Sequence, residues 1–184
     1  MEQKGKNVET RERATAYGAT AYVGPGEGRS LWVLGSQLLT YKVTAEQTGG
    51  AYSLFEGTVP PQEGSPPHIH HREDESFYVV EGEFEFLQDG EAIRAGAGSL
   101  FYVPKGCLHA FKNVGEEKGR LLLSQTPGGL HERFFEEIGE EATDRTTPPA
   151  AEGQPDAERI VAVAARYGTE IPAWNVGGEK VKAR

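Results

Sequence analysis

The chain has 184 residues, and its 19 Lys and Arg against 28 Asp and Glu give a formal net charge of −9. This length and charge indicate one acidic domain and argue against a nucleic-acid partner, because phosphate binding needs clustered basic side chains. The 24 Gly and 11 Pro favour short strands joined by turns over long helices. Cys107 is the single cysteine, which excludes a disulfide within the chain.

Residues 1–30 are polar and rich in glycine, and they predict an N-terminal arm. The N-terminus contains no apolar stretch typical of a secretory signal or of a membrane span. We therefore expect a cytoplasmic protein with no membrane partner, whose ordered structure begins near Leu31.

Residues 31–126 consist of short β-branched and aromatic runs separated by turns, which predicts an all-β barrel or jelly roll. The clearest hairpin signal is Asp89-Gly90, because a two-residue turn needs positive φ angles. The predicted strands are Leu31–Val43, Ala51–Val59, Ser76–Glu81, Glu83–Gln88, Glu91–Arg94, Leu100–Val103, His109–Asn113 and Leu121–Gln125.

Residues 127–184 predict a helical extension followed by a polar tail from Asn175. The first helix is expected over Leu130–Glu141, with apolar residues at helical spacing. After a proline-rich linker, Asp156 is suited to cap a second helix over Ala157–Tyr167, with Gly168 following its end. Both helices are expected to pack on the barrel or on a second subunit, so we predict a homodimer.

Two imidazoles and a carboxylate lie close together in the segment from Gly64 to Gly82. Alternate residues of a strand share a face, so His68 and His70 can point to one place. After a polar bend, Glu75 opens the next strand. A carboxylate beside two imidazoles is a common set of ligands for divalent metals.

A third imidazole follows a predicted turn at Pro104–Gly106. This turn reverses the chain and brings His109 forward on a neighbouring strand, which ends at Asn113.

Together these segments resemble the cupin superfamily. The first cupin motif is matched by His68, His70, Glu75 and Gly82, and the second by Gly98, Pro104, Gly106, His109 and Asn113. One departure concerns loop length, since Gly64 precedes His68 by four residues where the family usually has six.

The resemblance implies a cupin jelly-roll barrel, also called a double-stranded β-helix, followed by short C-terminal α-helices. It also implies one divalent transition metal, Fe, Mn, Ni, Co, Cu or Zn, bound through His68, His70, Glu75 and His109. Three imidazoles and a carboxylate suit such an ion on chemical grounds as well, and they do not select among these metals.

Other reactive side chains receive structural interpretations. His71, Glu73 and Asp74 are expected to be solvated in the bend before Glu75, and His131 is expected to be structural. Cys107 shares the strand parity of His109, but we expect it to act as a small buried apolar residue.

The post-barrel run Thr126–Gly129 and the strand from Phe77 to Glu83 further resemble small single-barrel cupins similar to quercetin 2,3-dioxygenases. Nothing after residue 131 repeats the H-x-H pattern, which indicates one barrel. The leading hypothesis is a dioxygenase whose partners are dioxygen and an aromatic enol such as a flavonol, with Glu75 as general base. Its expected pocket residues are Phe55, Phe77, Phe84, Phe86, Tyr102 and Phe111.

Two alternatives use the same barrel. One is a metal-dependent isomerase or lyase of a small carbonyl or sugar compound, which would require basic side chains at the pocket. Its candidates are Arg94, Lys105, Lys112 and Arg120. The other is a non-catalytic barrel that binds a small molecule.

Overall fold

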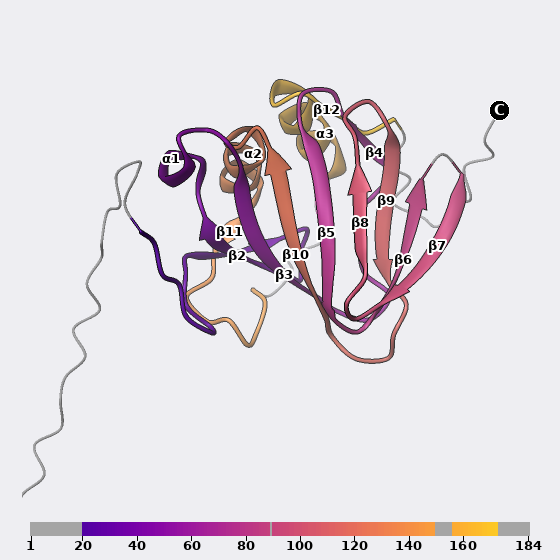
Figure 1. Cartoon of the computed structure of the whole chain (residues 1–184), viewed down its shortest axis with the longest axis horizontal. Helices are drawn as coiled ribbons and strands as arrows, with labels where there is room; N and C mark the ends of the chain where they lie inside the picture. The colour runs from indigo at the N-terminus through magenta and orange to yellow at the C-terminus, as the bar shows by residue number, and fades with distance from the viewer. Residues whose placement is uncertain (1–19, 89, 150–155, 173–184) are drawn as a thin grey trace, which may run out of the picture.

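The computed structural model describes residues 20–88, 90–149 and 156–172, which form two antiparallel sheets (Figure 1). The order in the first sheet is β11 (Glu140–Glu141), β1 (Ser30–Val33), β2 (Gln37–Val43), β3 (Ser53–Val59), β10 (Gly119–Thr126), β5 (Asp74–Glu81) and β8 (Leu100–Val103). The order in the second sheet is β12 (Thr169–Glu170), β4 (His68–His70), β9 (Leu108–Asn113), β6 (Glu83–Gln88) and β7 (Glu91–Gly96). This mostly-β architecture of two sheets confirms the predicted fold class.

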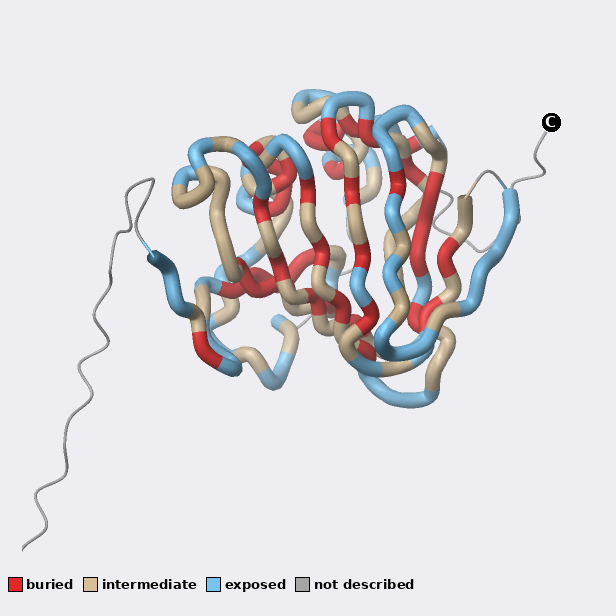
Figure 2. The backbone as a smooth tube through the Cα atoms, viewed as in Figure 1, coloured by how far each residue is buried: buried red, intermediate tan, exposed pale blue. Residues whose placement is uncertain are grey.

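The core forms between the sheets because apolar side chains alternate along the strands. In β3 every second residue is buried, and the same alternation gives the banded tube of Figure 2. Phe55, Phe77, Phe84 and Phe86 are at most 1% exposed. Side chains of alternating parity on both sheets thus fill the interior as in other two-sheet packings.

Turns set the register of the strands near the site. Gln88 pairs with Glu91, so residues 89–90 connect β6 to β7 in a two-residue loop. Gly90 has the positive φ, +89°, that such a turn requires, while Asp89 lies outside the described residues. Gly106, with φ +88°, lies in the turn that leads from β8 into β9 and hence to His109.

Some strand boundaries differ from the prediction. The run Leu31–Val43 is two strands, because Leu34 and Gly35 adopt positive φ angles and reverse the chain between β1 and β2. In addition, β5 begins at Asp74, two residues before the predicted start.

The helices follow the predicted order with shorter ends. A short helix, α1 (Ala45–Thr48), was not predicted and is capped by the side chain of Thr44. Helix α2 (Leu130–Ile138) stops before Gly139, and the predicted helical residues Glu140–Glu141 instead pair with β1 as β11. Helix α3 (Ala157–Arg166) has the predicted Asp156 cap, whose carboxylate accepts from the amide of Arg159 at 3.0 Å.

Helices α2 and α3 lie side by side at one end of the barrel (Figure 1). Strand β12, directly after α3, pairs with β4, so the C-terminal segment adds a strand beside the H-x-H strand. The predicted arm over residues 1–19, the centre of the linker and the tail from Asn175 lie outside the described residues. No helix among the described residues is long and apolar enough to span a membrane.

Candidate metal centre

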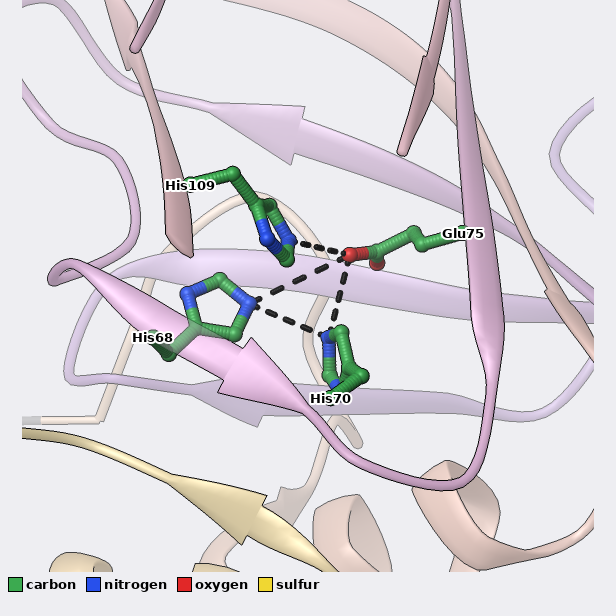
Figure 3. A group of neighbouring side chains, drawn as sticks. All are labelled: His68, His70, Glu75 and His109. Carbon is green, nitrogen blue, oxygen red and sulfur yellow. Dashed lines mark hydrogen bonds and ion pairs between the residues drawn. The ribbon is translucent and has the colours of Figure 1, made fainter. Parts of the chain in front are cut away.

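The four predicted ligands converge in the interior (Figure 3). Strand β4 carries His68 and His70, β9 places His109 directly opposite His68, and Glu75 projects from β5. Oε2 of Glu75 lies 2.9 Å from Nε2 of His109 and 3.1 Å from Nε2 of His70. The four donor atoms lie within 4.8 Å of one another, and all four residues are buried.

Hydrogen bonds on the outer side of each imidazole fix its orientation. Nδ1 of His68 donates to the carbonyl of Pro66 at 2.8 Å, and Nδ1 of His109 donates to the carbonyl of Cys107 at 3.0 Å. Nδ1 of His70 lies 3.1 Å from the hydroxyl of Thr169 on β12. The two carbonyls require a hydrogen on Nδ1 of His68 and of His109, and the Thr169 hydroxyl can accept one from His70. With the hydrogen on Nδ1, each neutral imidazole keeps its Nε2 lone pair for the interior.

This arrangement fits a divalent ion. Nε2 of His68 and Nε2 of His70 are 3.1 Å apart, and two lone pairs at that distance repel each other unless a positive charge lies between them. The Glu75 carboxylate faces the same point and is held from behind by Nε2 of Gln125, which donates to Oε1 at 2.7 Å. The donor set therefore suits a bound cation, without specifying which metal.

The charges of the site are coupled. Burial lowers the pKa of His68 well below its usual value and also lowers the pKa of His70. Burial alone would raise the pKa of Glu75, but His70 and His109 outweigh burial and hold this pKa well below the usual range. Burial opposes a charge on His109, yet the hydrogen bond and charge of Glu75 raise its pKa. Without metal, His109 is thus the one of these three histidines that retains a proton to the highest pH.

An apolar cavity opens beside the cluster, and His68 and Glu75 are among the residues that line it. Its apolar wall comes mainly from β1 and the turn after it, from β2, β3, β9, β10, α2 and α3, and from the residue after β12: Val33, Leu34, Leu38, Leu39, Val59, Phe111, Leu123, Phe134, Phe135, Ile160 and Ile171. A molecule that reaches the cluster is therefore surrounded mainly by hydrocarbon.

The predicted aromatic pocket is largely wrong. Of its six members only Phe111 lines this cavity. Phe55, Phe77, Phe84 and Phe86 pack within the core, and Tyr102 is 54% exposed because β8 turns Val103 inward and Tyr102 outward. The other two phenylalanines that line the cavity, Phe134 and Phe135, come from α2.

The predicted role of Glu73 is also wrong. Glu73 is 1% exposed. Its Oε1 accepts from the backbone amide of His131 at 3.3 Å, and its Oε2 lies 3.3 Å from Nδ1 of the same residue. His71 is exposed, as predicted, and bonds Glu170 at the surface. Cys107 is half-buried against the core. The signal for Glu73 was its spacing of two from Glu75, which gives both carboxylates the same strand parity.

The basic side chains that could bind a sugar or phosphate substrate do not lie at the cavity. None of the lysines and arginines in the described part of the chain lines the cavity. Arg120 pairs with Glu81, and Arg94 lies near Glu85, on the outside of the barrel.

Comparison with known proteins agrees with this geometry. The cupin domain pattern matches residues 55–124. Protein SchB of Streptomyces halstedii is 34% identical over 105 residues, which cover 55% of this chain and 74% of SchB. The chain belongs to the cupin family. Quercetin 2,3-dioxygenase of Bacillus subtilis is 28% identical to this cupin over 124 residues, or 67% of the chain. The chain spans only 36% of the length of that enzyme.

Solved structures support the fold alone. The structure of KdgF from Halomonas sp. superimposes with a TM-score of 0.55 at 20% identity, covering 60% of this cupin and 96% of KdgF. The rest of this chain has no counterpart in that match.

Proposed function

We propose that this cupin is a divalent-metal-dependent dioxygenase of an enol that has an apolar body. The observation that carries the proposal is that an apolar cavity reaches the four-residue cluster, since His68 and Glu75 of that cluster line it. The likeness to quercetin 2,3-dioxygenase supports the same reaction class, since that relative is similar over 67% of the chain.

In this proposal the four residues hold the metal, which supplies a Lewis acid and a site for dioxygen when bound. The imidazoles bind through Nε2, because their Nδ1 atoms are engaged on the outer side. The apolar wall binds the body of the enol and excludes water from the cluster.

Glu75 is the proposed general base, but its surroundings constrain that role. Oε1 accepts from Gln125, and Oε2 faces His70 and His109. A carboxylate oxygen has two lone pairs, so Oε1 keeps one for a substrate proton beside the bond from Gln125, while Oε2 is directed at the histidines.

The experiment begins with metal analysis of the purified protein. Protein loaded separately with each first-row candidate metal is then supplied with maltol, acetylacetone and 3-hydroxyflavone while dioxygen uptake is recorded. Uptake that depends on one metal and one enol, and that His70→Ala abolishes, supports the proposal. No uptake with any metal form and enol would overturn it.

The alternatives predict other outcomes of the same experiment. The cavity lining contains no lysine or arginine among the described residues, which disfavours a sugar-phosphate isomerase. Tight enol binding with no turnover in any metal form would instead identify a small-molecule-binding cupin.

We also propose a homodimer in the cytoplasm. The exposed side chains of Tyr78, Leu100 and Tyr102 on β5 and β8 offer an apolar surface for the second subunit. A monomeric mass by light scattering would contradict the dimer.

A further inference from the structure

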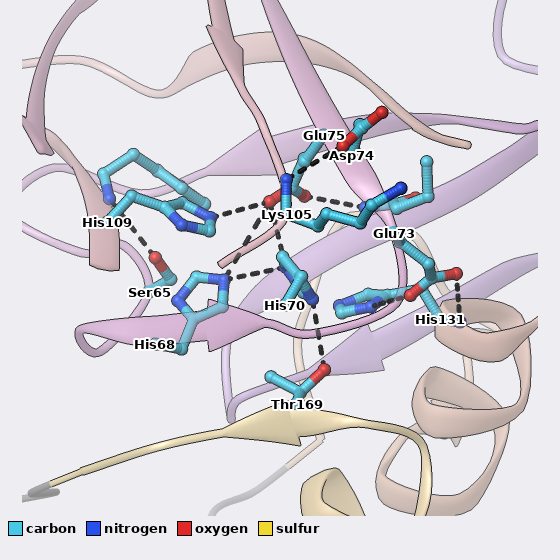
Figure 4. Close-up of polar contacts among 12 residues, drawn as sticks. Ser65, His68, His70, Glu73, Asp74, Glu75, Lys105, His109, His131 and Thr169 are labelled. Atoms are coloured by element: carbon cyan, nitrogen blue, oxygen red, sulfur yellow. Dashed lines mark hydrogen bonds and ion pairs between the residues drawn. The ribbon is translucent and has the colours of Figure 1, made fainter. Parts of the chain in front are cut away.

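Glu73 and His131 form a buried pair behind the metal cluster, although neither belongs to the predicted ligand set (Figure 4). Glu73 lies in the bend between β4 and β5, and His131 lies in the first turn of α2. The pair is 1% and 5% exposed. The His131 ring packs against that of His70 with centroids 4.5 Å apart, so the pair adjoins the cluster directly.

Glu73 fixes how the His131 ring presents its nitrogens. One carboxylate oxygen accepts from the backbone amide of His131, and the other faces Nδ1 of the same residue. A carboxylate only accepts hydrogen bonds, so Nδ1 carries the hydrogen and donates it to Glu73. Nε2 of His131 is then left with an unshared lone pair.

The cavity is the open space next to the His131 ring. His131 is one of the residues that line the cavity, together with His68 and Glu75. The hydrogen bonds among the described residues give Nε2 of His131 no protein partner. Among the described residues, the one fully enclosed side-chain polar atom without a hydrogen-bond partner is Oε1 of Gln125. Nε2 of His131 also has no partner, so it is not fully enclosed, and a small molecule can reach it.

We infer that His131 is a substrate-binding residue whose Nε2 accepts a hydrogen bond from a hydroxyl of the cavity ligand, with Glu73 as the positioning residue that sets its tautomer. This inference deepens the proposed function and rests on it for the identity of the substrate as an enol. The ligand class is a hydroxyl-bearing molecule with an apolar body, because Nε2 accepts and the surrounding wall is hydrocarbon.

The same three side chains, His70, Glu73 and His131, are close enough to hold an ion. His70 turns Nε2 toward the predicted ligand cluster and Nδ1 toward Thr169, however, so neither of its nitrogens is free for a second ion. The hydrogen-bonding role uses only the atom that lacks a partner, and we therefore favour it.

The test measures the affinities of phenol, anisole and benzaldehyde for zinc-loaded protein by calorimetry. Phenol donates a hydrogen bond, whereas anisole and benzaldehyde only accept. The wild type should bind phenol about five-fold more tightly than anisole, the effect of one hydrogen bond. His131→Asn keeps a donor for Glu73 but lacks Nε2, so this ratio should fall close to one.

Glu73→Gln gives the sharper result. The glutamine oxygen can still accept from the amide of His131, while its NH₂ group donates to Nδ1, which moves the ring hydrogen to Nε2. The preference for phenol should then disappear, and benzaldehyde should bind several-fold more tightly than it binds the wild type. Asp74→Asn, a matched change at the next residue that does not line the cavity, should keep the wild-type preference.

Besides the absence of a phenol preference in the wild type, two results with the variants would overturn the inference. One is a phenol preference that survives in folded Glu73→Gln and His131→Asn, and the other is a second equivalent of zinc that both variants lose. Failure of the proposed function is separate, because it gives no dioxygen uptake with any enol while the phenol preference and its dependence on residue 73 persist. Dioxygen uptake together with no wild-type phenol preference would refute only the role of His131.

Discussion

The hydroxyl of Thr169 links the C-terminal segment to the metal cluster, and replacing it with a methyl group tests how His70 is oriented. Thr169 is 4% exposed and pairs with His70 across β12 and β4. Its Oγ1 lies 3.1 Å from Nδ1 of His70. Thr169→Val keeps the shape of the side chain and the strand pairing, so the change removes little beyond this hydrogen bond.

Two effects of Thr169→Val follow from the structure. Nδ1–H of His70 would be buried without an acceptor, which costs about 1–3 kcal/mol of stability. The ring also loses the contact that directs Nε2 toward the cluster, and the loss of such an outer partner typically lowers metal affinity by about 10- to 100-fold. Both effects should appear together in the variant.

The assay is a competition titration of metal-free protein against a chromophoric chelator, with thermal unfolding recorded in the presence of a chelator. Glu170→Gln is the matched control, because Glu170 is the next residue of β12 and bonds the exposed His71. We expect wild-type metal affinity in that control. A folded Thr169→Val protein that binds metal within about two-fold of the wild type would refute the reasoning that an outer partner directs His70.

The remaining predictions concern the ligands, their protons and the core. His70→Ala and His109→Ala should each lower the metal affinity at least about 100-fold, since each removes one of four donors. Unchanged metal content by mass spectrometry would contradict the assignment. Metal binding should release a proton from His109 at pH values below its raised pKa, because Glu75 raises that pKa while burial lowers the pKa of His70. The metal affinity should therefore rise with pH above 6.5, the usual pKa of histidine, until His109 is neutral. Calorimetry in two buffers of different ionisation enthalpy measures the number of protons released on metal binding. No proton release would disprove the coupling between His109 and Glu75. Phe55→Ala should lower the free energy of unfolding by about 3–5 kcal/mol, because this ring is fully buried; urea denaturation measures the loss, and a change below about 1 kcal/mol would be inconsistent with that packing.

The ligand cluster was predictable because local rules determine most of it. Strand parity places His68 and His70 on one face, and the turn before β9 brings His109 opposite His68. The same parity brings Glu75 inward. These rules act over a few residues each, so spacing along the chain carried the information.

The surroundings of the cluster were not predictable in the same way. Thr169 is 99 residues from His70 in the sequence, and Glu73 is 58 residues from His131. Such contacts depend on how the C-terminal helices pack, and no local sequence pattern predicts that packing. The prediction that Tyr102 lines the pocket was wrong for a related reason, because aromatic character alone does not indicate which face of an edge strand is buried.

The division between these two groups of residues bears on specificity. The cupin pattern covers residues 55–124, which include all four predicted metal ligands. The residues that direct His70 and close the cavity, Thr169, His131, Phe134 and Ile171, come from the segment after it. Changes in that segment can alter which ligand is bound without altering the donor set. For this reason, likeness in the shared region is weak evidence about the substrate, and the variants at positions 73, 131 and 169 test it more directly than the metal ligands do.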